Sequence, residues 1–177
     1  MLLKILIALL IALSLVGILI YVQPGHYKVE RTIQIASTPA TVYRLVTDFH
    51  NWEQWSPWAK LDPMMKQQYT GSPSGVGAGY HWQGNSQAGE GRMTVRQAVP
   101  NEKAVIFIEF LKPIASTSDA TFVLRPEGAN TTVTWSMDGE TTFASKAIQL
   151  FYGMDKMIGP DFEKGLAQLK AAAEATH

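Results

Sequence analysis

The 177-residue chain carries 15 basic and 15 acidic residues and no cysteine. The balanced charge gives no broad electrostatic attraction to nucleic acid, and the lack of thiols excludes disulfides, thiolate nucleophiles and cysteine-ligated metal centres. With ~150 residues as a usual domain size, the length predicts one folded domain. We place it at residues 26–177, after an N-terminal segment of residues 1–25.

The N-terminal segment contains an uncharged and mostly aliphatic run at residues 5–22. As a helix this run would extend about 27 Å, close to the ~30 Å hydrocarbon core of a bilayer. A cleaved secretory signal is the alternative, but the small-x-small pattern that cleavage needs lies inside the run. We therefore predict an uncleaved single-pass anchor that ends at Pro24 and Gly25. The expected location is a membrane, and specifically a bacterial inner membrane, with the side of the globular domain left open.

The middle of the chain reads as strands with one short helical region. Residues 27–36 alternate in character, which predicts a half-buried strand. Ser37, Thr38 and Pro39 then signal a helix over about 39–48. From about 66 to 140 the two-residue period recurs between glycine- and proline-containing turns. This pattern predicts five or six antiparallel strands with one apolar face.

The last 35 residues change period. Apolar residues recur at three- and four-residue steps from Ala147 to Leu169, which is typical of an amphipathic helix. Because proline lacks a backbone N–H and clashes with the preceding turn, we expect a kink near Gly159 and Pro160. Such a helix can cover the concave face of a curved antiparallel sheet in an α+β fold. The interior between them would be filled by side chains or kept as a cavity.

Four segments make the chain resemble a known superfamily: RTIQIASTPATVYRLVTDFHNWEQWSPW, GVGAGYHWQG, TTVTWSMDGE and MDKMIGPDFEKGLAQLK. With the order of elements, they are similar to the helix-grip fold of the SRPBCC, or START-like, superfamily. This superfamily includes birch pollen allergens, lipid-transfer START domains and polyketide cyclases, and the chain most resembles bacterial polyketide cyclase/dehydrase and lipid transport proteins. The resemblance implies a hydrophobic cavity between sheet and long helix, but no universal catalytic motif.

Aromatic and apolar residues on the inward faces are the candidate lining of this cavity, although a packed core is an alternative use for them. The set comprises Trp58, Tyr69, Tyr80, Trp82, Phe110, Phe122, Trp135, Phe151, Met154 and Ile158. In the stretch DFHNWEQWSPW, we expect Trp52 and Trp55 to wedge the short helices against the sheet. Trp58 should lie nearest the ligand.

Two residues are candidates for acid–base chemistry. Glu109 is the best candidate for a general base, because burial in an apolar strand would raise the pKa of its carboxyl. Its alternative position is outward and solvated, next to Lys112. Tyr80 is a second candidate for proton handling. The four histidines lack partners at metal-ligand spacing, so we expect no metal and no cofactor.

Three functions are consistent with these features. The first is a membrane-anchored, non-enzymatic binder or carrier of a hydrophobic small molecule or lipid. The second is a cyclase- or dehydratase-like enzyme, which requires Glu109 to face inward. The third is a partner-binding module, which would expose a large apolar area on the folded domain. The oligomeric state and the ligand remain open.

Overall fold

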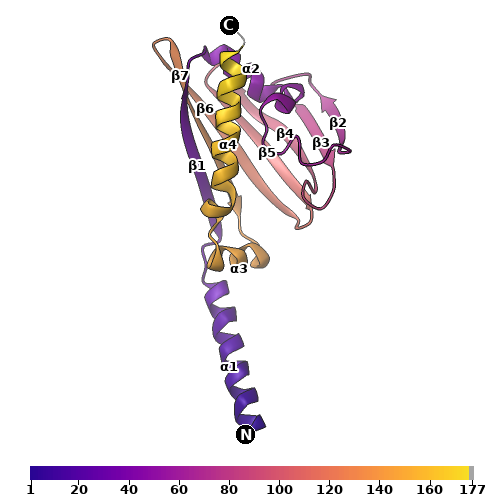
Figure 1. Cartoon of the computed structure of the whole chain (residues 1–177), viewed down its shortest axis with the longest axis vertical. Coiled ribbons are helices and arrows are strands. Elements are labelled where there is room, and N and C mark those ends of the chain that lie inside the picture. The colour runs from indigo at the N-terminus through magenta and orange to yellow at the C-terminus, as the bar shows by residue number, and fades with distance from the viewer. Residues whose placement is uncertain (176–177) are drawn as a thin grey trace.

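Seven antiparallel strands form one curved sheet around a C-terminal helix (Figure 1). The computed structural model describes residues 1–175, without the side chains of residues 144, 148 and 151. Neighbouring strands follow the order β1-β7-β6-β5-β4-β3-β2. Each strand from β2 to β6 therefore forms a hairpin with the next strand in the chain, and β1 pairs with β7. The strands are β1 (His26–Ile35), β2 (Lys66–Gly71), β3 (Ala78–Gln83), β4 (Glu90–Val99), β5 (Lys103–Lys112), β6 (Ser116–Glu127) and β7 (Asn130–Glu140).

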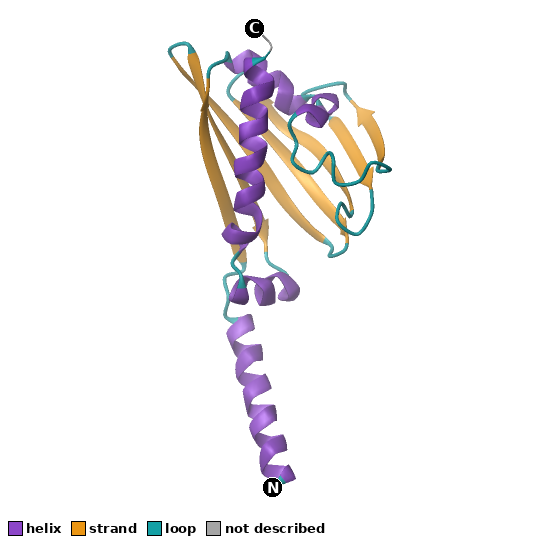
Figure 2. Ribbon diagram, in the orientation of Figure 1, coloured by secondary structure: helices purple, strands orange, loops and turns teal. Residues whose placement is uncertain are grey.

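The helices lie where the chain leaves the sheet (Figure 2). α2 (Pro39–Thr47) and the 3-10 helix η1 (Phe49–Gln54) connect β1 to β2, and α3 (Phe143–Phe151) and α4 (Met154–Glu174) follow β7. α1 (Leu2–Tyr21) precedes β1 and projects away from the sheet. The predicted helix-grip fold, with one apolar helix in front of it, is confirmed.

The core lies between the concave face of the sheet and α4. In β6, the alternating residues Ala120, Phe122 and Leu124 are buried, as the two-residue period predicts. α4 contributes Phe162 and Leu166, together with Leu169, at helical spacing. Each large apolar side chain that is fully buried stabilises the fold by roughly 1.5–3 kcal/mol.

The tryptophans of η1 and its exit lock the short helices onto the core. Trp52 Nε1 donates to the Val46 carbonyl at 2.9 Å, and Trp55 Nε1 donates to the Leu45 carbonyl at 3.0 Å. Both rings are buried, and both bonds satisfy carbonyls at the C-terminal end of α2, which lack helical partners. The predicted wedge role is confirmed for Trp55, whose ring meets Phe122 and Trp135 of the sheet, whereas the ring of Trp52 packs on Phe49 and Trp55 within the same segment.

The C-terminal helical region is divided into two helices at Gly153, where the sequence predicted one long helix. The chain leaves α3 and starts α4 at Gly153, whose φ of 71° is readily adopted only by glycine. α4 then continues through Gly159 and Pro160 without interruption. Gly159 serves packing instead, since a Cβ there would overlap the guanidinium of Arg31 on β1. The kink expected near Gly159 and Pro160 stays a prediction, whereas the break between α3 and α4 at Gly153 was not predicted.

Candidate ligand cavity

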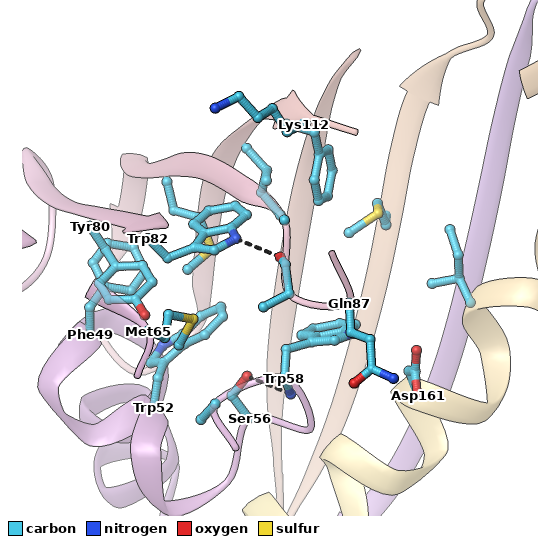
Figure 3. A pocket seen from close by; sticks show the side chains of 18 of the residues that line it. Phe49, Trp52, Ser56, Trp58, Met65, Tyr80, Trp82, Gln87, Lys112 and Asp161 are labelled. Carbon is cyan, nitrogen blue, oxygen red and sulfur yellow. Dashed lines mark hydrogen bonds between the residues drawn. The ribbon is translucent and has the colours of Figure 1, made fainter. Parts of the chain in front are cut away.

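A cavity of about 460 Å³ lies between the concave face of the sheet, the η1 segment and the first turns of α4 (Figure 3). This volume falls within the ~300–1,000 Å³ range of pockets for small organic molecules. Its walls are mostly aromatic and sulfur-containing. The methionines among them are Met65, Met93, Met137, Met154 and Met157, whose unbranched side chains adapt to ligands of different shape.

Most of the residues proposed as lining from sequence face this cavity. They are Trp58, Tyr69, Tyr80, Trp82, Phe110, Trp135, Met154 and Ile158. They come from the η1 exit, β2, β3, β5, β7 and α4, because the inward positions of these elements converge on one space. The side chain of Phe151 lies outside the described part of the chain.

Phe122 does not line the cavity, contrary to the expectation. It is fully buried behind Trp135, its cross-strand partner, with ring centroids 4.9 Å apart. Phe162 of α4 also stacks on Trp135, with ring centroids 4.0 Å apart and an interplanar angle of 10°. This stack of three rings fills the interior beside β6 and β7. It therefore forms one solid wall of the cavity.

The sequence reasoning missed several lining residues. Phe49 and Trp52 reach the cavity from η1, and Tyr27 reaches it from the start of β1. Met93 and Tyr27 could have been found, because each occupies the inward register of its strand. Met65 lies in an irregular segment, where no period indicates which way a side chain points.

The polar groups of the cavity are few and mostly paired. Trp82 Nε1 donates to the Ala88 carbonyl at 3.0 Å, and the Tyr69 hydroxyl donates to Gln67 Oε1 at 2.9 Å. The Tyr27 hydroxyl pairs with Ser118 Oγ at 2.8 Å. These bonds hold the rings in place and leave few groups free to orient a ligand.

Two groups are exceptions among the described residues: the buried Trp135 Nε1, which has no hydrogen-bond partner, and the hydroxyl of Tyr80. The Tyr80 hydroxyl has no hydrogen-bond partner among residues 1–175, and its ring packs between Tyr69 and Trp82. Burial raises the pKa of this hydroxyl, and the negative charges of ionised Tyr69 and of Glu53 raise it further. Tyr80 is consequently protonated at neutral pH. It can donate a hydrogen bond to a ligand but is a poor general base.

Glu109 lies on the opposite face of β5. Ile108 and Phe110 on either side of it line the cavity, so the alternation of the strand turns Glu109 outward. Its register partner on β4 is the exposed Arg92. The inward position that the general-base hypothesis requires is not observed.

Arg31 connects β1, at the edge of the sheet, to α4. Its guanidinium donates to Asp155 Oδ1 at 2.7 Å and to Glu163 Oε1 at 2.8 Å, both on α4. These bonds hold the pKa of the Asp155 carboxyl below its usual range. Arg31 thus positions the first turns of α4, which carry Met154, Met157 and Ile158 along the cavity.

One family model matches most of the chain. The family model for polyketide cyclase/dehydrase and lipid transport matches residues 26–174. No curated protein matches the chain.

Solved structures share the fold at low sequence identity. Protein MLL2253 from Mesorhizobium loti is 21% identical, with a TM-score of 0.60, over 85% of this chain and 99% of its own. CV1439 from Chromobacterium violaceum is 15% identical, with a TM-score of 0.59, over 85% and 98%. The Aha1 dimer from Colwellia psychrerythraea is 17% identical, with a TM-score of 0.58, over 84% and 96%. The chain belongs to the polyketide cyclase/dehydrase and lipid transport family.

Proposed function

We propose that this protein is a membrane-anchored binder or carrier of a hydrophobic small molecule or lipid, held in the cavity between sheet and α4. One observation carries the proposal: a space of about 460 Å³ stays open in the interior, lined by aromatic and methionine side chains. A domain without a ligand would gain stability by filling such a space, because interiors normally pack closely.

The lining limits the chemistry of the ligand. The ionisable side chains that reach the cavity, apart from its tyrosines, are Glu53, Lys112 and Asp161, and none of these is buried. A charge placed deep among the aromatic rings would lose its hydration without gaining a partner. The ligand should therefore be neutral in its buried part, with a hydrogen-bond acceptor near Tyr80 and any charged group near Lys112.

The anchor is supported by the surface of α1. This helix spans 20 residues, Lys4 is its one charged residue, and nearly all of its side chains are exposed. Apolar surface on this scale is stable in lipid and unfavourable in water. An uncleaved anchor predicts that the mature protein in the membrane fraction has the mass of the whole chain. A mass lacking the first 20 or so residues would favour the cleaved signal.

A substitution that fills the cavity with a larger side chain tests whether the ligand binds there. Met93→Trp places a large ring in the cavity, whereas Thr94→Trp places the same ring on the outer face of β4. We expect the wild type and the Thr94 variant to retain an apolar ligand in native mass spectrometry and to bind a fluorescent fatty acid. The Met93 variant should lose both. A wild-type protein that carries no ligand and binds no apolar probe would refute the proposal.

A further inference from the structure

The cavity opens toward the end of the domain from which α1 emerges. Apart from Glu53, its exposed lining residues are Gln87, Lys112, Pro113 and Met157. They lie in the β3–β4 loop, at the end of β5 and in the turn after it, and in the first turn of α4. Pairing of Glu90 with Lys112, of Ser118 with Gly139 and of His26 with Glu140 puts these segments and the start of β1 at one end of the sheet.

The connection between α1 and this end is short and fastened. The four residues from Val22 to Gly25 separate α1 from β1, and an extended chain would cover at most about 18 Å from Tyr21 to His26. Thr141, after β7, donates its hydroxyl to the Pro24 carbonyl at 2.7 Å and its N–H to the Gly25 carbonyl at 3.0 Å. If α1 spans a bilayer, this end of the domain cannot stand far above the lipid.

α3 lies at the same level, crosswise to α1 and between α1 and the sheet (Figure 1). It packs against α1, and Lys146 Nζ donates to the Tyr21 carbonyl at 3.2 Å. Tyr21 ends the apolar helix and marks where the hydrocarbon core would stop. A helix joined to that residue lies at the lipid–water boundary.

Large apolar side chains are exposed at this end of the domain. We name Leu111, Ile114, Phe143, Tyr152 and Met157 the apolar rim; they are between 38% and 72% exposed. They come from the end of β5, the β5–β6 turn, the start of α3, its exit and α4. Exposed groups of this kind mark an interaction surface, and tyrosine suits the headgroup region.

We propose that the apolar rim and α3 rest in the interface of the bilayer that holds α1, so that the cavity opens directly onto lipid. The proposal uses one part of the proposed function, the insertion of α1. Its consequence is a route for an apolar ligand from bilayer to cavity without passage through water. Continuity with α1 favours lipid as the occupant over a second protein.

The absence of native cysteine allows single labels to be placed cleanly. Ile114→Cys and Tyr152→Cys place an environment-sensitive fluorophore on the rim. Val99→Cys is the matched control, an exposed apolar residue at the opposite end of β4. Ile11→Cys, in the middle of α1, reports insertion of the anchor. The full chain is reconstituted in vesicles of phosphatidylcholine and phosphatidylglycerol, with or without lipid that carries a nitroxide near the headgroup.

We expect nitroxide lipid to quench the labels at 114 and 152 several-fold more than the label at 99. Quenching at the level of residue 99, with Ile11 inside the bilayer, overturns the docking proposal and leaves the anchored binder intact. Protection of the rim labels from a water-soluble quencher without lipid quenching also overturns it, because another protein surface would then cover the rim. An Ile11 label outside the bilayer removes both the anchor and the docking surface.

Discussion

Removal of the Phe162 side chain of α4 tests whether the buried stack of aromatic rings closes the interior beside the cavity. The Phe162 ring is fully buried, stacks on Trp135 at 4.0 Å and meets the edge of Trp58 at 6.4 Å. Phe162→Ala deletes one of the three rings in the solid wall. The new space would lie next to Trp58 and Trp135, which both line the cavity.

The expected cost follows from burial and stacking. Replacing a buried phenylalanine by alanine destabilises a protein by about 3–5 kcal/mol, and a lost aromatic pair contributes about 0.5–1.5 kcal/mol of such a change. We therefore expect about 4 kcal/mol. At about 2–4 °C per kcal/mol for a chain of this size, the midpoint of thermal unfolding should fall by roughly 8–16 °C.

The assay is thermal unfolding of the full chain in detergent, followed by near-ultraviolet circular dichroism of the tryptophans. Phe107→Ala is the control: it removes the same ring from the half-buried outer face of β5 and should cost clearly less. We also expect Phe162→Ala to favour bulkier apolar ligands. A loss below about 1 kcal/mol would refute the view that this stack closes the interior, since such a value is typical of a partly exposed side chain.

Three further substitutions or conditions test the site and its support. Tyr80→Phe should leave stability nearly unchanged, because the hydroxyl has no partner among the described residues. It should weaken ligand affinity about fivefold in a fluorescence titration, since one hydrogen bond contributes about 1 kcal/mol. Because burial raises the pKa of Tyr80 above its ordinary value of 10.0, the folded state holds this proton more tightly than the unfolded state. The free energy of unfolding should consequently fall as pH rises above about 10, and urea denaturation should show a smaller fall in Tyr80→Phe. Gly159→Ala should lower the thermal midpoint, because the new Cβ displaces the Arg31 guanidinium from Asp155 and Glu163. In an Arg31→Ala background the same change should be neutral or stabilising, since alanine favours helix over glycine by about 1 kcal/mol; an equal loss in both backgrounds would contradict the steric explanation.

Local periodicity carried most of the information about the fold. In β1, β4, β6 and β7, buried and exposed residues alternate. Side chains two positions apart in a strand point to the same face of the sheet, so the pattern in the sequence is also the pattern in the fold. The same logic placed Tyr80, Trp82 and Phe110 on inward faces, and all three line the cavity. The same alternation indicates that Glu109 points outward, because it lies between two inward residues of β5.

Periodicity does not distinguish a cavity wall from a packed core. Phe122 and Trp135 are direct partners on one face of the sheet, yet only Trp135 borders the open space. Which of the two rings borders the cavity depends on the side chains that pack above the sheet. Trp55 and Trp58 at the η1 exit and Phe162 on α4 all contact the Trp135 ring. These contacts join segments far apart in the chain, so no local pattern encodes them.

The sequence alone determined an apolar N-terminal helix, an antiparallel sheet, an amphipathic C-terminal helix and the family to which they belong, because each is written in short-range patterns. Tertiary structure decided where the C-terminal helix breaks. Gly159 accommodates Arg31 from the first strand, while the chain turns at Gly153. Tertiary structure also decided that the cavity opens beside α1. That opening depends on strand register, which brings the β5–β6 turn and the start of α4 to one end of the sheet.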